Sequence, residues 1–226
     1  SPDQREDPRH IRAAGAAART TAVKQFNSVV LMTPSGARDV YDKRVLVPFG
    51  EYVPGESAMP ILRRMLPRAG AFSSGAAVEP FAFAGHRVSV SVCFEDLLVA
   101  TDRPASGDAH LLVNLTSDAW FRETIVPSLH LALAKSRAIE HRRFLVRATN
   151  TGITAVVDPV GRIIARLPAD AVDSAAVTVR WMSGTTPFDR IGELPWAAAV
   201  LVAAAFATLK KPSRRAPAEG HVADGR

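Results

Sequence analysis

Only one cysteine, Cys93, occurs among the 226 residues, and aromatic side chains make up just 7% of them. A single thiol excludes an intrachain disulfide framework, and no cysteine–histidine cluster has the spacing of a zinc site. The net charge is +6, yet the sequence has no basic stripe interleaved with aromatic residues and no nucleic-acid motif. We therefore expect neither a cofactor nor a nucleic-acid partner.

The N-terminal residues 1–24 are polar, rich in alanine and arginine, and without the apolar core of a signal peptide. The chain also begins with Ser1. We expect it to be a trimmed chain or a piece of a longer one. A folded domain is predicted to follow over residues 25–188.

Strand-like and helix-like segments alternate after residue 25, which predicts an α/β fold of packed layers. The clearest strand is residues 87–93, where valines alternate with serines and Cys93. The clearest helix is residues 128–143, in which Leu129, Ala132, Leu133 and Ser136 repeat at helical spacing. We also predict a short helix at 57–66 and strands at 26–32, 38–42, 110–115, 144–149, 153–158, 162–167 and 175–181.

Cys93 ends its predicted strand on the polar face and is followed directly by Phe94, Glu95 and Asp96. A thiol at a strand end is accessible to a substrate. It reacts as the thiolate, so it needs a base or a cation nearby. The alternative is a half-buried cysteine that packs as a small hydrophobic residue. The strand pattern alone leaves both interpretations open.

Near the C-terminus an uncharged, alanine-rich run follows Trp196 and ends at Lys210 and Lys211. The run is shorter than the roughly 20 residues that usually span a bilayer, and a buried helix is one interpretation. We predict a transmembrane helix over residues 189–211, because the run is apolar on all faces with tryptophan at one end and basic residues at the other. The basic tail, residues 212–226, would then be cytoplasmic.

Four motifs occur in order along the chain: YDKRVLVPFGEYVP at 41–54, VCFE at 92–95, NLTSDAWF at 114–121 and RATNTGITA at 147–155. Together with the Thr-Pro-Phe at 186–188, they resemble the apolipoprotein N-acyltransferases. These are membrane-embedded members of the carbon–nitrogen hydrolase (nitrilase) superfamily. The resemblance covers about residues 25–211. It implies an α/β fold, namely a partial nitrilase-like α-β-β-α sandwich followed by a C-terminal transmembrane helix.

The resemblance also implies roles for individual residues. By motif, Cys93 is the nucleophile and Lys43 is the lysine of the family's glutamate–lysine–cysteine triad. A neighbouring ammonium favours the thiolate and stabilises an oxyanion on the attacked carbonyl, and the backbone N–H of Phe94 is a second oxyanion donor. Glu51 and Glu95 match two supporting glutamates. They either hold the lysine and help to transfer a proton, or make only structural contacts.

Further side chains are predicted to contact the substrate or to satisfy backbone groups near the thiol: Phe94, Trp120, Asn114 and Asn150. The family's base glutamate lies upstream of the lysine, and no residue here matches its motif. Only 42 residues precede Lys43. The chain is therefore interpreted as the C-terminal portion of such an enzyme, without the N-terminal membrane helices, and we expect low activity from residues 1–226 alone.

The implied reaction moves a fatty acyl group from a phospholipid to a Cys93 thioester, and then to the α-amino group of an N-terminal diacylglyceryl-cysteine on a lipoprotein. The implied partners are the phospholipid donor, the apolipoprotein acceptor and a membrane. The implied location is the bacterial inner membrane, with the catalytic domain on its periplasmic face. Two alternatives stay open: a nitrilase-like amidase that uses the same cysteine, and an inactive remnant that serves as a binding module.

Overall fold

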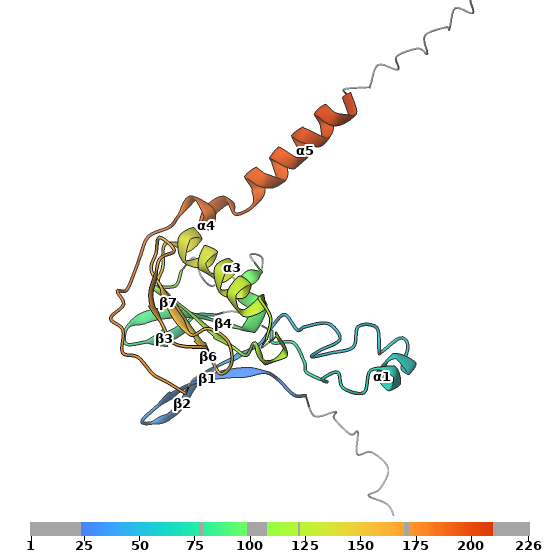
Figure 1. Ribbon diagram of the computed structural model, residues 1–226, viewed down its shortest axis with the longest axis horizontal. Coiled ribbons are helices and arrows are strands. Elements are labelled where there is room, and N and C mark those ends of the chain that lie inside the picture. The colour runs from blue at the N-terminus through green and yellow to red at the C-terminus, as the bar shows by residue number, and fades with distance from the viewer. Residues whose placement is uncertain (1–23, 77–78, 99–107, 122, 170–171, 210–226) are drawn as a thin grey trace, which may run out of the picture. The chain divides into compact units, whose positions relative to one another are not determined.

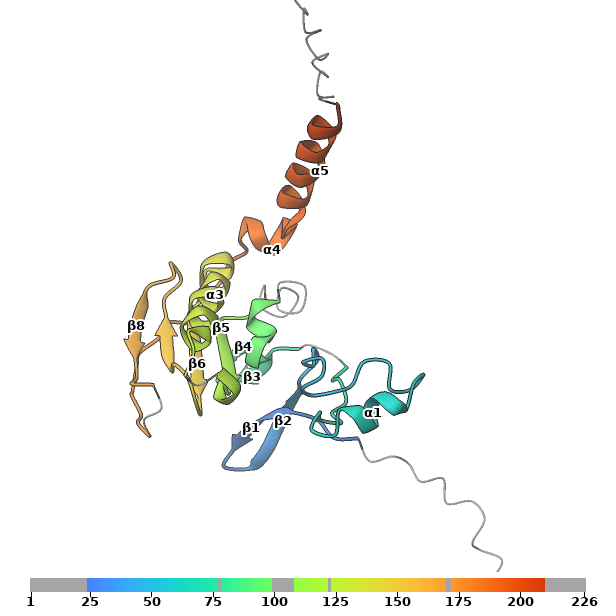
Figure 2. The same ribbon diagram turned by 45° about the vertical axis from the view of Figure 1, so that its right-hand side comes forward.

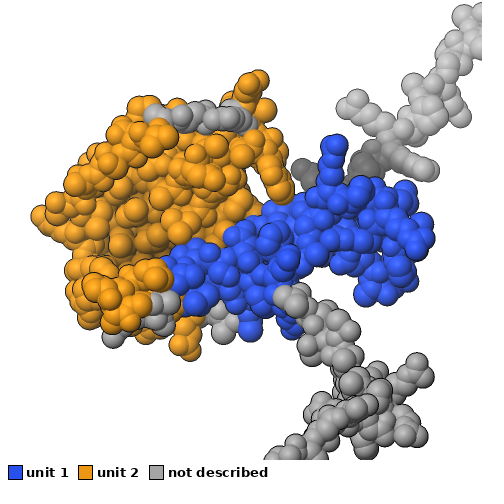
Figure 3. Space-filling model, turned by 90° about the horizontal axis from the view of Figure 1, so that it is seen from below, with its two compact units in different colours: residues 1–30, 40–77 blue, residues 31–39, 78–226 orange. Residues whose placement is uncertain are grey.

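The structure, a computed structural model, describes residues 24–76, 79–98, 108–121, 123–169 and 172–209. Two compact units are distinguished in Figure 3: residues 1–30 with 40–77, and residues 31–39 with 78–226. Each unit is described by itself below. The predicted basic tail lies outside the described residues, and so does the predicted polar N-terminal segment except for Lys24. The predicted domain boundaries remain predictions.

The second unit is built on a six-stranded sheet whose spatial order follows the sequence. The three central strands, β4, β5 and β6, run parallel, and the outer three pair antiparallel. In the register of the parallel strands Val92 lies opposite Leu115, and Thr116 lies opposite Thr149. The strands are β3 (Phe81–Phe83), β4 (His86–Val92), β5 (Leu111–Thr116), β6 (Leu145–Thr149), β7 (Ala155–Val157) and β8 (Ile163–Arg166).

The helix α3 (Val126–His141) makes the crossover from β5 to β6 and lies against one face of the sheet in both ribbon views (Figures 1 and 2). Its Leu131, Ala134 and Ala138 are buried in a core shared with the sheet residues Leu112 and Leu145. The helix begins two residues before the predicted 128–143, with a proline in its first turn, where a missing N–H costs nothing.

The side chains that repeat at helical spacing in the sequence are not the buried ones of this helix. Leu129, Ala132 and Leu133 are exposed, and Ser136 is only half-buried. The buried side is offset by about one position and includes small and polar residues: Pro127, His130, Leu131, Ala134, Arg137, Ala138 and His141. The buried side of α3 carries alanines where it packs against the sheet, and polar side chains where it contacts the polar residues near Cys93.

The first unit holds much of a two-stranded hairpin, β1 (Ser28–Thr33) with β2 (Gly36–Asp42), whose outer residues 31–39 group with the second unit. It also holds a long shaped loop and the one-turn helix α1 (Ile61–Met65). The hairpin agrees with the predicted strands at 26–32 and 38–42. The helix is shorter than the predicted 57–66 because Pro60 stands at its N-cap, where it begins the helix rather than continuing one.

Two predictions about the later part of the chain are corrected. Residues 175–181, predicted as a strand, have no regular secondary structure. In the sheet that the structure describes, β8 is the last strand, and no strand pairs with this alternating segment. The short strand β3 was not predicted. The prediction of a mixed α/β fold is confirmed.

The C-terminal helices are α4 (Pro187–Ile191) and α5 (Leu194–Leu209). Every described side chain of α5 is exposed, including Leu194, Trp196 and Phe206. Among the helices that the structure describes, none is both long and apolar enough to cross a membrane. The predicted transmembrane helix over 189–211 is therefore not confirmed, and its basic flank, Lys210 and Lys211, lies outside the described residues.

Candidate active site

Cys93 lies where the parallel strand β4 ends, and its backbone is unusual. It is half-buried, carries a free thiol, and has a φ of 57°, in the left-handed region that residues other than glycine seldom adopt. The short 3-10 helix η2 (Cys93–Leu97) starts at this residue. Such a conformation costs about 1–3 kcal/mol and persists only where the surroundings impose it, which is common at reactive residues.

Hydrogen bonds made by two side chains, Glu95 and Asn114, impose the turn on Cys93. The Val92 N–H donates to Oε2 of Glu95 at 2.8 Å, so the carboxylate closes the first turn of η2. The Nδ2 of Asn114, on β5, donates to the carbonyl oxygen of Cys93 at 2.9 Å and to Oγ of Ser91 at 3.1 Å. Asn114 therefore contacts the backbone of the nucleophile itself, and Glu95 contacts the backbone of the residue before it. A direct role of Glu95 or Asn114 on the substrate remains a prediction.

The loops after the neighbouring strands meet at the same edge of the sheet, because the carboxyl ends of parallel strands point the same way. The N–H of Asp118 donates to the carbonyl of Thr151 at 3.0 Å, and the N–H of Asn150 donates to that of Thr116 at 3.2 Å. In open α/β sheets this edge is where ligands bind. Cys93 is thus placed at the edge where chemistry is expected.

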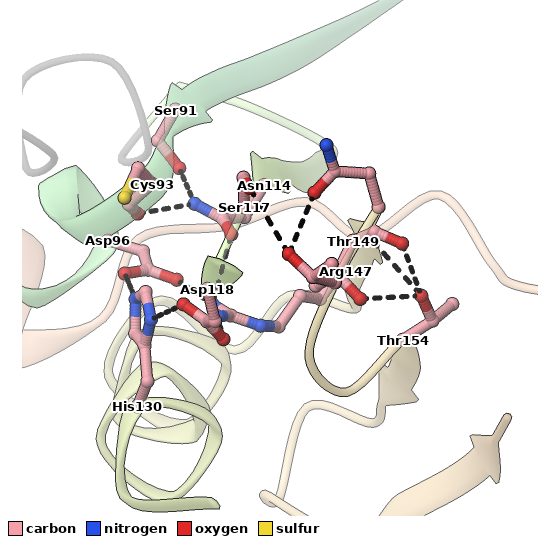
Figure 4. A network of polar contacts seen from close by, with 12 residues as sticks. Ser91, Cys93, Asp96, Asn114, Ser117, Asp118, His130, Arg147, Thr149 and Thr154 are labelled. Carbon is pink, nitrogen blue, oxygen red and sulfur yellow. Dashed lines mark hydrogen bonds and ion pairs between the residues drawn. The ribbon is translucent and has the colours of Figure 1, made fainter. Parts of the chain in front are cut away.

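Four buried charged side chains form a network beside the Cys93 turn (Figure 4). His130 of α3 lies between Asp96 and Asp118, with ring nitrogens 3.0 Å and 2.9 Å from their oxygens. Arg147 of β6 donates to Oδ2 of Asp96 at 2.7 Å, to Oδ2 of Asp118 at 3.3 Å and to Oδ1 of Asn114 at 3.0 Å. The network joins η2, α3, β5 and β6.

The network shifts the pKa values of two of its members in opposite directions. Burial alone would lower the pKa of His130, but its hydrogen bonds to Asp118 and Asp96 outweigh burial and raise that pKa above its usual value. Burial would raise the pKa of Asp118, and the hydrogen bond and charge of His130, together with Arg147, lower it instead. Both shifts favour the charged forms.

These shifts predict how stability depends on pH. The stabilisation from His130 is complete below its unfolded pKa of about 6.5 and is lost as pH rises through its raised folded pKa. The stabilisation from Asp118 is present above the unfolded pKa of this residue, about 3.9, and is lost as pH falls through its lowered folded pKa. Urea unfolding should therefore show the largest difference between wild type and His130→Gln at about pH 4–6.5. His110→Gln, the same change outside the network, should show no such profile, and a difference that grows with pH would contradict this account.

Gly152, in the loop after β6, is required by the same network. Its φ is 109°, and an added Cβ would lie 2.6 Å from Oδ2 of Asp118. Gly85 also has a positive φ, 78°, but open space where its Cβ would be. Gly152→Ala should therefore cost about 1.5 kcal/mol more than Gly85→Ala, because only the first displaces a charged hydrogen-bond partner. Equal losses in urea unfolding would mean that backbone strain alone explains both.

In the first unit, Lys43 and Glu51 form a buried ion pair. The Nζ of Lys43, which is 1% exposed, donates to Oε1 and Oε2 of Glu51 at 2.9 and 2.8 Å. Glu51 also accepts hydrogen bonds from the Val47 N–H at 2.8 Å and from Nδ2 of Asn27 at 3.2 Å. Glu51 therefore contacts the lysine, and whether this contact serves catalysis or only the structure remains a prediction. The predicted meeting of Lys43 with Cys93, which belongs to the second unit, stays a prediction.

The other predicted substrate contacts are less enclosed. Phe94 is half-buried, whereas Asn150 is exposed and Trp120, in η3 (Ala119–Phe121), is 66% exposed. The Oδ1 of Asn150 accepts a hydrogen bond from the Thr151 hydroxyl at 3.1 Å. Their roles in substrate binding therefore remain predictions.

His130 and Arg147 were not among the site residues predicted from the sequence. One signal could have found the histidine: His130, Ala134 and Ala138 recur at a spacing of four residues, which puts His130 on the helix face with the small buried residues. No comparable signal exists for Arg147. A charged residue in a central strand is unexpected until its carboxylate partners, distant in sequence, are known.

Comparison with known proteins identifies the family. The family model for carbon-nitrogen hydrolases matches residues 10–181. The chain belongs to the carbon-nitrogen hydrolase family. Among curated proteins, this carbon-nitrogen hydrolase is 41% identical over 188 residues to an apolipoprotein N-acyltransferase of Ralstonia nicotianae, and 37% identical over 193 residues to one of Geobacter metallireducens.

These matches cover 80% and 81% of the chain but only 36% and 37% of the two relatives. The chain therefore spans little more than a third of their length. Among solved structures, a glutamine-dependent NAD+ synthetase from Acinetobacter baumannii superposes with a TM-score of 0.51 at 17% identity, over 66% of this chain and 27% of that one. This likeness supports the fold assigned to the carbon-nitrogen hydrolase family.

Proposed function

We propose that this chain contributes the nucleophile-bearing part of an apolipoprotein N-acyltransferase. The observation that carries the proposal is the 41% identity over 188 residues to a protein of that name. The geometry of Cys93 supports it, because a free thiol on a strained turn at the carboxyl edge of a parallel sheet suits covalent catalysis. The six-stranded sheet would be one layer of the α-β-β-α sandwich.

In the proposed first step the Cys93 thiolate attacks the ester carbonyl of a phospholipid acyl chain. A sulfur–carbon bond forms, the ester carbon–oxygen bond breaks, and the lysophospholipid leaves as an alcohol after taking a proton. In the second step the free α-amine of a diacylglyceryl-cysteine attacks the thioester, forms the amide, and returns the sulfur as a thiol. Lys43 is proposed to stabilise the oxyanion in both steps, with Glu51 holding its ammonium.

A membrane location is proposed on two grounds. The donor and the acceptor both carry acyl chains, and α5 exposes apolar side chains along its whole described length, including Leu201 and Phe206. Surface of that kind is costly in water and is compatible with lipid. We propose that α5 contacts the inner membrane, with the catalytic part on the periplasmic side.

The test is acyl transfer by the 226-residue chain in detergent micelles. A phospholipid with a labelled acyl chain is incubated with a synthetic peptide that begins with diacylglyceryl-cysteine, and the label should appear on the peptide's α-amine. The same peptide with an acetylated amine is the control and should stay unlabelled. Release of labelled free fatty acid with no labelled peptide would identify a hydrolase instead, and no turnover of the phospholipid would favour an inactive remnant.

A further inference from the structure

The four charged side chains beside the Cys93 turn are not used by the proposed reaction. Asp96, His130, Asp118 and Arg147 are each at most 6% exposed. Burying four ionisable groups is costly unless their charges and hydrogen bonds balance. One member of the cluster, Asp96, lies in the same 3-10 turn as the nucleophile. The placement of the cluster therefore requires a physical explanation.

Hydrogen-bond accounting fixes the charge of His130. Both ring nitrogens face carboxylate oxygens, one from Asp96 and one from Asp118. Ionised carboxylates only accept hydrogen bonds, and a neutral imidazole has a single N–H to donate. With both carboxylates ionised, only the imidazolium satisfies both contacts. With it, two carboxylates are balanced by one imidazolium and one guanidinium, and the cluster is neutral.

The charged groups of the His130 network come from three segments packed near it. Asp96 belongs to η2, Asp118 to the segment after β5, and Arg147 to β6. The other charged groups on the buried side of α3 are paired elsewhere. Arg137 binds Glu140, and His141 binds Asp189. Within the described part of the second unit, the positive groups paired with Asp96 and Asp118 are His130 and Arg147.

We propose that His130 is a positioning residue for the nucleophile. Its imidazolium holds Asp96, and through Asp96 the η2 turn, so that Cys93 keeps the left-handed backbone from which its thiol reacts. This inference rests on the proposed role of Cys93 as the nucleophile. When His130 loses its proton, one carboxylate faces a lone pair and the buried cluster becomes negative. The turn then loosens, Cys93 relaxes toward an ordinary φ, and its reactivity falls.

The experiment uses iodoacetamide, because Cys93 is the only thiol in the chain. Alkylation rates of the 226-residue protein are measured from about pH 5 to about pH 10, a range that spans histidine and thiol ionisation. In wild type the rate, corrected for the thiolate fraction, should be high at low pH and fall through a second ionisation. In His130→Gln it should be about tenfold lower below that ionisation and should meet the wild-type curve above it.

His110→Gln is the matched control and should follow wild type, because His110 lies before β5, outside the network. Identical curves for wild type and His130→Gln would overturn the inference. If His130→Gln does not fold, the wild-type protein provides the test. The ring protons of His130 are followed by NMR, and their titration must have the same midpoint as the second alkylation step. A mismatch overturns the inference.

Alkylation needs no acyl donor, so the two proposals fail separately. A difference between the curves without any acyl transfer would overturn the proposed function alone. Acyl transfer together with identical curves would overturn the role of His130 alone.

Discussion

Replacing Lys43 by methionine is expected to lower the free energy of unfolding by about 3–5 kcal/mol. The change removes the ammonium that both oxygens of Glu51 accept from at 2.8 and 2.9 Å, and leaves a buried carboxylate with only the weaker Val47 and Asn27 donors. A buried charge that loses its partner costs far more than the intact pair contributes. Urea unfolding measures the loss.

Two further variants show whether the lost stability comes from the buried Glu51 carboxylate that is left without its ammonium partner. The ion pair between Arg87 and Asp108 spans 3.5 Å, and both side chains are at least half exposed, so Arg87→Met is the control and should cost at most about 1 kcal/mol. The double variant Lys43→Met/Glu51→Leu should recover most of the lost stability, because both charges are gone. It should still fail to transfer acyl groups. Full activity in the double variant would remove Lys43 from the mechanism.

Replacing Cys93 by alanine is expected to abolish measurable acyl transfer, because no covalent intermediate can form. Stability should change little or rise slightly. The alanine keeps the Cβ, and the contacts that impose the turn, from Asn114 and Glu95, are made by the backbone on either side of the Cβ. The transfer assay and urea unfolding on the same preparation separate the two effects.

Ser91→Ala is the control for this prediction. Its hydroxyl accepts from Asn114 at 3.1 Å but is one residue removed from the reacting turn. It should keep most of the acyl transfer, while Cys93→Ala should not. Transfer that persists in Cys93→Ala would mean that another group receives the acyl chain.

Much of the second unit could be predicted from local patterns, because its central strands and α3 have strong periodicity. The alternation of valine and serine located β4, and Pro127 marked the start of α3. What local patterns did not determine was which helix face is buried. Leu129 and Leu133 are the more apolar residues, but burial of α3 follows the sheet and the His130 network, which come from tertiary structure.

The residues of the candidate site likewise fall into those that local sequence predicts and those that depend on tertiary structure. Cys93, Lys43 and Glu51 could be predicted because they stand in sequence motifs, and the Lys43–Glu51 pair is eight residues apart along one loop. His130 and Arg147 are separated from Asp96 by 34 and 51 residues. Contacts at such separations leave no periodic trace, so a buried charge in a helix or strand cannot be paired with its partner from one sequence.

The central claim is that Cys93 carries the acyl group as a thioester. Its most direct test is the intact mass of the 226-residue chain after incubation with a phospholipid and no acceptor. The account predicts one added acyl group, located at Cys93 by peptide mapping, removed by neutral hydroxylamine, and absent from Cys93→Ala. An acyl adduct that resists hydroxylamine, or one that maps to another residue, would contradict it.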